Sequence, residues 1–355
     1  MQTVTVTENY APRRDGRGLF YLAAGPEDGP LVILVHGWPE LALSWHNQLV
    51  ALGSLGFRAV APDLPGYGRS WISREAEDYR TENIVGEMRF LLASLGRETA
   101  VWIGHDMGSP IVWSIANHHP EICQAVASVG VPYHTVELSL EHLVTTIDRE
   151  VYPEDVYPTG IWDYRYFYRD HFARATQVFD AAPERTVRCL FVRGDPDCAR
   201  EPAFIANVGR DGGWFGGADM APDVPLDTEV LTEAEYHAFA ASLKRNGFFG
   251  PDAYYLNFAA NDAYSRTAVN DYRLDMPVLF IDLAHENTPE CVHSGFADPM
   301  RRLCRDLTAV SIPSGHWASQ ERPIDLNGAI VHWLATSAKV WPAMAAPAWR
   351  PVPAT

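Results

Sequence analysis

The sequence predicts an α/β fold in which an eight-stranded, mostly parallel sheet is flanked by helices and interrupted by a mainly helical lobe. Short apolar runs alternate with segments whose apolar residues recur at spacings of three and four. This alternation is typical of buried parallel strands joined by helices. A long stretch rich in aromatic residues and poor in β-branched runs then separates the sixth apolar run from the seventh. We therefore expect one sheet whose sequence is split by an insertion.

The predicted strands and core helices follow from these patterns. The strands are expected at 3–7, 18–24, 31–36, 58–62, 100–105, 125–131, 277–281 and 308–312. The first two flank the polar segment APRRDGR, which favours an antiparallel hairpin at one edge of the sheet. The core helices are expected at 41–55, 82–95, 109–118 and 325–336.

The aromatic-rich insertion defines the expected domain organisation. The first part of the core, the helical lobe and the second part of the core are predicted at 1–132, 133–272 and 273–355. Within the lobe, residues 162–172 and 231–250 are predicted to be helical, whereas residues 195–225 are rich in Gly, Pro and Asp and predict an irregular loop.

Composition narrows the classes of partner. The formal net charge of -17 argues against a nucleic-acid partner, because the phosphate backbone is itself negative. No apolar run reaches the ~18 residues of a membrane span, and the first residues lack the pattern of a secretory signal. We expect a cytoplasmic protein.

The five cysteines include no C-x-x-C pair, which favours reduced thiols over disulfides or a zinc site.

The segment VWIGHDMGSP places an acidic residue, Asp106, between a predicted strand and a predicted helix. Gly104 and Gly108 flank it at a distance of two, which is the spacing of a nucleophile elbow, where small neighbours allow a sharp turn that exposes the central side chain. The structural alternative is that Asp106 is the N-cap of the following helix.

The segment HGWPE follows the third predicted strand. It could direct the backbone N–H of Trp38 into the cleft, where the N–H of Met107 would be the second donor of an oxyanion hole. The alternative is a tight turn enforced by Gly37 and Pro39.

A histidine and a carboxylate complete the pattern. His316 lies in GHW just after the last strand, and Glu286 follows the seventh strand. The chain order of nucleophile, acid and histidine is the order used by hydrolases with a nucleophile elbow. Asp282 is the competing acid, but it lies closer to the strand and is expected to be buried or paired there. Asp106, Glu286 and His316 are thus a candidate triad at the carboxyl ends of the strands.

With these motifs in place, the chain resembles the α/β-hydrolase-fold epoxide hydrolases that use an aspartate nucleophile. HGWPE, DLPGYGRS, GHDMGS and GHW stand in the family's order, and the resemblance covers nearly the whole chain. It implies an α/β-hydrolase core with a helical cap, an acid at Glu286 where the family usually has Asp, and two cap tyrosines. These map onto Tyr164 in WDYRYFY and Tyr255 in GFFGPDAYYLNF, with Tyr166 and Tyr254 as competing choices.

The aspartate itself narrows the reaction. A carboxylate that attacks a saturated carbon forms an ester, which an activated water can hydrolyse, whereas a serine would form a stable ether. Epoxides and alkyl halides are the two substrate types that fit. An epoxide needs a proton donor for its alkoxide, which the tyrosines would supply. Haloalkane dehalogenases typically place a halide-binding Trp after the nucleophile, where this chain has Met107. The presence of Met107 instead of this Trp favours epoxide hydrolysis to a diol.

A haloalkane or haloacid dehalogenase is the alternative enzyme. A non-catalytic ligand-binding protein on the same fold is the alternative from another class.

Further residues are expected to shape the site. His36, Gly37 and Pro39 belong to the motif, and aromatic side chains suggest walls for an apolar or aromatic epoxide. These wall candidates are Trp38, Trp113, Trp162, Phe167 and Tyr133. No cofactor and no metal is implied. The oligomeric state stays open, with a homodimer as one alternative.

Overall fold

The computed structural model describes residues 4–198, 201–286 and 295–342. Its eight strands form one sheet with the spatial order β1-β2-β4-β3-β5-β6-β7-β8. The strands are β1 (Thr7–Ala11), β2 (Leu19–Ala24), β3 (Leu31–Val35), β4 (Arg58–Pro62), β5 (Ala100–His105), β6 (Cys123–Val129), β7 (Leu274–Leu283) and β8 (Cys304–Ile312). The pairs from β4 onward in this order are parallel, while β1, β2 and β4 pair antiparallel. The predicted mostly parallel sheet of eight strands is confirmed.

The first strand differs from the prediction. The antiparallel hairpin exists, but β1 spans Thr7–Ala11 rather than 3–7. Pairing of Ala11 with Leu19 closes the hairpin over a shorter turn, so the strand lies four residues later than the TVTVT alternation indicates. Val4 and Val6 instead pack at the border of the apolar core. Residue 3 lies outside the described residues.

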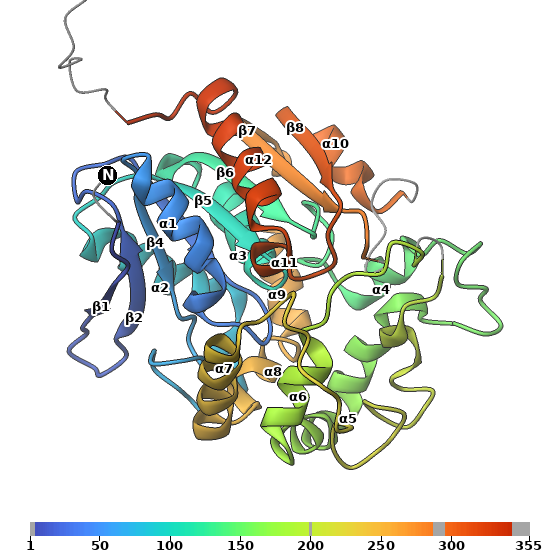
Figure 1. The fold of residues 1–355 in the computed structure, drawn as a ribbon. Helices are drawn as coiled ribbons and strands as arrows, with labels where there is room; N and C mark the ends of the chain where they lie inside the picture. The colour runs from blue at the N-terminus through green and yellow to red at the C-terminus, as the bar shows by residue number, and fades with distance from the viewer. Residues whose placement is uncertain (1–3, 199–200, 287–294, 343–355) are drawn as a thin grey trace, which may run out of the picture.

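Helices cover both faces of the sheet (Figure 1). Outside the insertion they are α1 (His46–Ser54), α2 (Thr81–Ser94), α3 (Gly108–His118), α10 (Asp298–Leu303), α11 (Ala318–Glu321) and α12 (Pro323–Thr336), with short 3-10 turns η1 (Ala42–Trp45), η2 (Ala76–Tyr79), η3 (Pro120–Ile122) and η7 (Gly295–Ala297). Helices α1 and α12 bury residues such as Leu49 and Trp333 in one apolar cluster, whereas α2 and α3 bury Met88 and Trp113 in another. Alternate residues of the central strands enter the two clusters, as expected for strands buried on both faces.

The segment between β6 and β7 is helical and forms a cap (Figure 1). Its elements are α4 (Leu140–Thr145), η4 (Gly160–Trp162), α5 (Asp163–Asp180), α6 (Pro183–Leu190), η5 (Phe204–Asn207), α7 (Glu233–Asn246), α8 (Phe249–Ala253), α9 (Phe258–Ser265) and η6 (Asn270–Tyr272). A capping box between Thr232 and Glu235 starts α7 by satisfying free backbone N–H groups. The domain boundaries at 132/133 and 272/273 stay predictions.

The topology brings four motifs to one edge of the sheet. The parallel strands β3, β5, β7 and β8 end at the same edge of the sheet, so the residues that follow them share the carboxyl edge where open α/β sheets bind ligands. Trp38, Asp106, Glu286 and His316 are those residues. Among the described helices, none is long and apolar enough to cross a bilayer.

Candidate active site

Asp106 lies in a strained turn between β5 and α3. Its backbone has a φ of 46°, in the left-handed region that an aspartate seldom adopts. A Cβ on Gly108 would collide with the carbonyl oxygen of Val35, so the tight turn requires glycine there. This combination of strand, left-handed turn and helix is the geometry of a nucleophile elbow.

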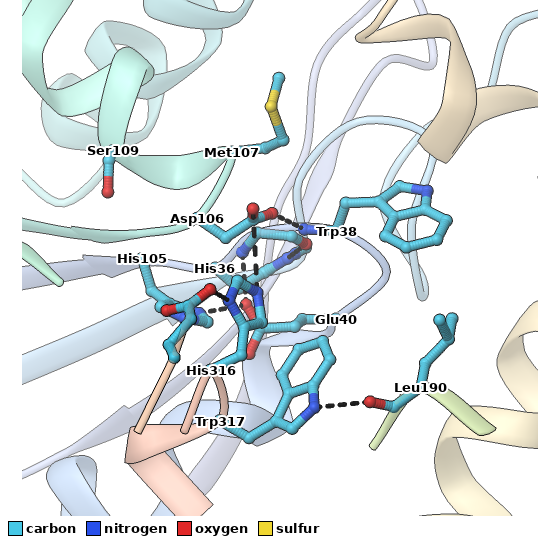
Figure 2. Close-up of polar contacts among 12 residues, drawn as sticks. His36, Trp38, Glu40, His105, Asp106, Met107, Ser109, Leu190, His316 and Trp317 are labelled. Carbon is cyan, nitrogen blue, oxygen red and sulfur yellow. Dashed lines mark hydrogen bonds and ion pairs between the residues drawn. The ribbon is translucent and has the colours of Figure 1, made fainter. Parts of the chain in front are cut away.

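The side chain of Asp106 does not cap the helix. The N-cap residue of α3 is Met107, and no side chain makes a cap hydrogen bond there. The carboxylate of Asp106 instead accepts a hydrogen bond at Oδ1 from the backbone N–H of Trp38, at 2.7 Å (Figure 2). The N-cap interpretation is therefore wrong, because the carboxylate turns away from the helix and toward the loop after β3.

His316 lies between two carboxylates. Its Nδ1–H donates to Oε1 of Glu286 at 2.7 Å, and its Nε2 lies 3.8 Å from Oδ2 of Asp106. Figure 2 shows the imidazole and the Asp106 side chain turned toward one another. Burial lowers the pKa of His316, but the charge and hydrogen bond of Glu286 and the charge of Asp106 outweigh it and raise the pKa to about 9. The imidazole is therefore protonated near pH 7 as long as the Asp106 carboxylate keeps its negative charge.

The competing acid has other contacts. Asp282, on β7, accepts a hydrogen bond from the Ser311 hydroxyl at 2.8 Å. Glu286, beyond the end of that strand, is the carboxylate that reaches the histidine, and its side chain is only 6% exposed. The structure thus brings Asp106, His316 and Glu286 together, while their roles in a reaction stay a prediction.

A second buried contact between a histidine and a carboxylate lies beside His316 and was not predicted from the sequence. Nδ1 of His105 lies 2.8 Å from Oε2 of Glu40, and the rings of His105 and His316 are 4.7 Å apart. Burial alone would raise the pKa of Glu40, but the charge and hydrogen bond of His105 lower it to about 2. The same oxygen of Glu40 accepts the N–H of Gly37 at 2.6 Å. Glu40 belongs to HGWPE and His105 to GHDMGS, and the available signal was that both motifs adjoin the ends of the neighbouring strands β3 and β5.

His36, Gly37 and Pro39 are buried beside the site and hold its loop. Nε2 of His36 accepts the Leu64 N–H at 3.0 Å, so Nδ1 carries the proton and donates to the Gly37 carbonyl at 2.9 Å. A Cβ on Gly37 would lie 2.5 Å from Oδ1 of Asp106, so only glycine allows this close approach. None of the three lines the cavity that lies between the sheet and the cap. Their contacts support the backbone from which the Trp38 N–H projects.

A cavity of about 450 Å³ lies between the carboxyl edge of the sheet and the cap. Trp38, Asp106, Met107, Glu286 and His316 line it from the core side. Tyr164 of α5, Tyr255 just after α8, Tyr168, Trp162, Ile161 and Trp214 line it from the cap side. Burial raises the pKa of both Tyr164 and Tyr255, so both phenols are neutral hydrogen-bond donors at neutral pH.

The competing tyrosines do not line this cavity. The hydroxyl of Tyr254 donates to the Pro65 carbonyl at 2.9 Å, and the ring of Tyr166 packs against the guanidinium of Arg169. Tyr164 and Tyr255 are therefore the members of each pair that face Asp106.

Several predicted pocket walls lie elsewhere. Trp113 is fully buried on α3, where its Nε1–H donates to the Val131 carbonyl at 3.1 Å. Phe167 packs against His171, and Tyr133 donates to the Tyr272 carbonyl. These side chains are outside the cavity lining, whereas Trp38 and Trp162 are part of it. Arg165, which was not among the predicted site residues, also lines the cavity.

Comparison with protein-family models matches residues 30–185 to the alpha/beta hydrolase fold. Epoxide hydrolase A of Mycobacterium tuberculosis is 29% identical, over 90% of this chain and 95% of the relative. Bifunctional epoxide hydrolase 2 of Sus scrofa is 28% identical over 94% of this chain, which spans 56% of that longer relative. Among solved structures, epoxide hydrolase A from Mycobacterium thermoresistibile superposes with a TM-score of 0.73 at 29% identity, covering 94% of this chain and 99% of the other.

Proposed function

We propose that this chain, which has the α/β-hydrolase fold and resembles epoxide hydrolases along nine-tenths of its length, converts an epoxide and water into a vicinal diol. One observation carries the proposal: an aspartate at the nucleophile elbow lines the same cavity as two neutral tyrosines of the cap. The carboxylate suits attack on a saturated carbon, and the phenols suit protonation of an oxygen that leaves as an alkoxide.

In the first half of the reaction, a carboxylate oxygen of Asp106 attacks one oxirane carbon. The bond between that carbon and the ring oxygen breaks, and the oxygen takes a proton from Tyr164 or Tyr255. The product is an ester of Asp106 that carries a neighbouring hydroxyl. The Trp38 N–H contact supports this step, because it fixes Oδ1 and leaves Oδ2 toward the cavity and His316.

In the second half, His316 removes a proton from water, and the resulting hydroxide attacks Cγ of Asp106. The oxyanion that forms would be held by the N–H groups of Trp38 and Met107, each donor contributing about 3 kcal/mol in comparable sites. Collapse breaks the bond between Cγ and the alkyl oxygen. The diol oxygen takes a proton from His316, and the new Asp106 carboxyl returns one to the tyrosine.

The electrostatics support this order of events. The negative charge of Asp106 is one of the groups that raise the pKa of His316. Ester formation removes that charge, so the pKa of His316 falls and the imidazolium releases its proton to bulk water. The neutral imidazole can then take a proton from the attacking water, and it is reprotonated from bulk water once the free Asp106 carboxylate returns. Glu286 keeps the ring oriented in both states.

We further propose a small-molecule substrate with an apolar or aromatic body, because Trp38, Trp162 and Trp214 line the cavity. A cytoplasmic location is part of the same proposal, and a homodimer is the oligomeric state to test first.

The experiment is an assay of purified protein with terminal, aryl and trans-disubstituted epoxides and, in parallel, with haloalkanes and haloacetates. Diol detected by chromatography, absent with Asp106→Asn, is the expected result. Release of halide without diol would replace the proposal by a dehalogenase. If neither epoxides nor halides react while ligands still bind, the protein is a non-catalytic receptor.

A further inference from the structure

Arg165 is a charged side chain inside the cavity that the proposed reaction does not use. It follows Tyr164 on α5, is 5% exposed and lines the same cavity as Asp106. A guanidinium stays protonated at every pH that a folded protein normally meets. A full positive charge therefore lies next to the reacting groups, and removing it from water costs free energy unless an anion compensates it.

The polar contacts of Arg165 supply only part of that compensation. Its Nε–H donates to the hydroxyl oxygen of Tyr164 at 3.0 Å, which leaves the phenolic hydrogen free to point elsewhere. One Nη–H contacts Sδ of Met107 at 3.8 Å, and a thioether is a weak acceptor. Both Nη groups thus lack an oxygen acceptor among the described residues.

The surroundings of the guanidinium are aromatic rather than acidic. Its central carbon lies 5.6, 5.7 and 5.5 Å from the ring centres of Trp162, Tyr164 and Tyr255. The carboxylates of Asp106 and Glu137 interact with it through space. Within the part of the chain that the structure describes, neither they nor any other carboxylate forms an ion pair with it.

We propose that Arg165 binds a carboxylate of the substrate, so that the preferred substrate is an epoxy acid. This inference rests on the proposed epoxide hydrolysis and specifies its substrate class. The planar fork of a guanidinium matches the two oxygens of a carboxylate, and the three rings would shield the pair from water. Arg165 would also offset the repulsion between the incoming carboxylate and Asp106.

The same contacts limit how far the carboxylate lies from the epoxide. Arg165 is hydrogen-bonded to Tyr164, and Tyr164 is proposed to donate to the oxirane oxygen. Hydrogen bonds of about 3 Å at each step place the carboxylate about one to three carbons from the ring. A 3-arylglycidate, which carries an aryl group on one oxirane carbon and a carboxylate on the other, fits both this limit and the aromatic walls.

The test compares 3-phenylglycidate with its methyl ester at pH 7. The wild-type protein should have a kcat/KM at least about tenfold higher for the acid. Arg165→Gln should lower kcat/KM for the acid about 10- to 100-fold, mainly through KM, and lower that of the ester much less. Arg193→Gln is the matched control, because Arg193 lines the cavity but is 61% exposed and paired with Asp227, so it should keep the preference.

Binding of unreactive analogues tests the anion site independently of turnover. Cinnamate should bind the wild-type protein at least about tenfold more tightly than cinnamamide, and Arg165→Gln should abolish that difference while still binding the amide. Equal affinity for both analogues, or equal losses for acid and ester in Arg165→Gln, would overturn the inference and leave Arg165 as a positioning residue for Tyr164. Preferential cinnamate binding without diol from any epoxide would support the anion site and contradict the proposed function instead.

Discussion

The rings of Tyr164 and Tyr255 meet edge to face, with their centres 5.8 Å apart, although they come from separate segments of the cap. Both line the cavity opposite Asp106, and burial keeps both neutral by raising the pKa of each phenol. Two phenol donors that line the same cavity can both donate to one oxygen atom of a bound substrate. The pair is therefore the structural basis for assigning an epoxide rather than a halide.

Replacing either tyrosine should slow ring opening. Tyr164→Phe and Tyr255→Phe should each lower kcat/KM about 100-fold, because each removes a proton donor to the leaving oxygen. Tyr254→Phe is the control, since the hydroxyl of Tyr254 contacts Pro65 and does not line the cavity. It should keep kcat/KM within about threefold of wild type, and a loss as large as that of Tyr255→Phe would reverse the assignment.

Replacing Glu286 should lower the pKa of His316. Burial lowers this pKa, and Glu286 contributes the largest opposing effect through its charge and hydrogen bond. Glu286→Gln should bring the pKa down by about 1 to 3 from its value near 9, as measured by NMR titration of the imidazole nitrogens. Asp282→Asn, which removes the carboxylate paired with Ser311, should leave it unchanged. The opposite pattern would make Asp282 the acid of the triad.

Replacing His316 should separate the two half-reactions. In His316→Gln the Asp106 carboxylate remains, so the ester forms, but no base activates water and hydrolysis stalls. Intact-protein mass spectrometry should show one substrate mass added and less than one equivalent of diol. His332→Gln, an exposed substitution on α12, should turn over normally. Sustained turnover by His316→Gln would exclude His316 as the base.

The stability of the protein should fall with rising pH because of Asp252. Its buried carboxyl accepts hydrogen bonds from Trp38, Tyr168 and Thr176, yet burial outweighs them and raises its pKa from 3.8 to about 8. Between these values the folded state binds more protons than the unfolded state, so folding is favoured below pH 4 and progressively less favoured up to pH 8.

Asp252→Asn removes this titration and keeps a neutral side chain of the same shape. Its Tm relative to wild type should increase by a few degrees from pH 4 to pH 8, measured by calorimetry. A Tm difference that is the same at both pH values would show that Asp252 does not change its protonation over this range.

Much of this site could be predicted because short motifs adjoin strands. Once β3, β5 and β8 are recognised as parallel strands, Trp38, Asp106 and His316 must meet at their common carboxyl edge. The position of β1 was harder to predict, because polar and apolar residues alternate in TVTVT at least as clearly as in TENYA. Only the pairing with β2 identifies TENYA as the strand. Local alternation carries no information about the register of a hairpin partner.

Side-chain direction within the helices explains what the sequence left open. Arg165 and Phe167 lie two residues apart on α5, yet only Arg165 reaches the cavity, because helix rotation sends them to different faces. The Glu40–His105 pair joins residues that are 65 positions apart, and only the folded backbone shows that they share a hydrogen bond. Trp113 was predicted as a pocket wall, but α3 directs its side chain into the core.

The proposed reaction requires that Asp106 becomes esterified, and an oxygen-isotope measurement can detect that ester through the fate of the water oxygen. A single turnover with excess enzyme in heavy-oxygen water, followed by mass spectrometry of the peptide that contains Asp106 and of the diol, locates the oxygen taken from water. The ester mechanism predicts label in the Asp106 carboxylate and none in the first diol, whose new oxygen comes from the enzyme. Label in the first diol with an unlabelled Asp106 would contradict it, because water would then have attacked the epoxide directly.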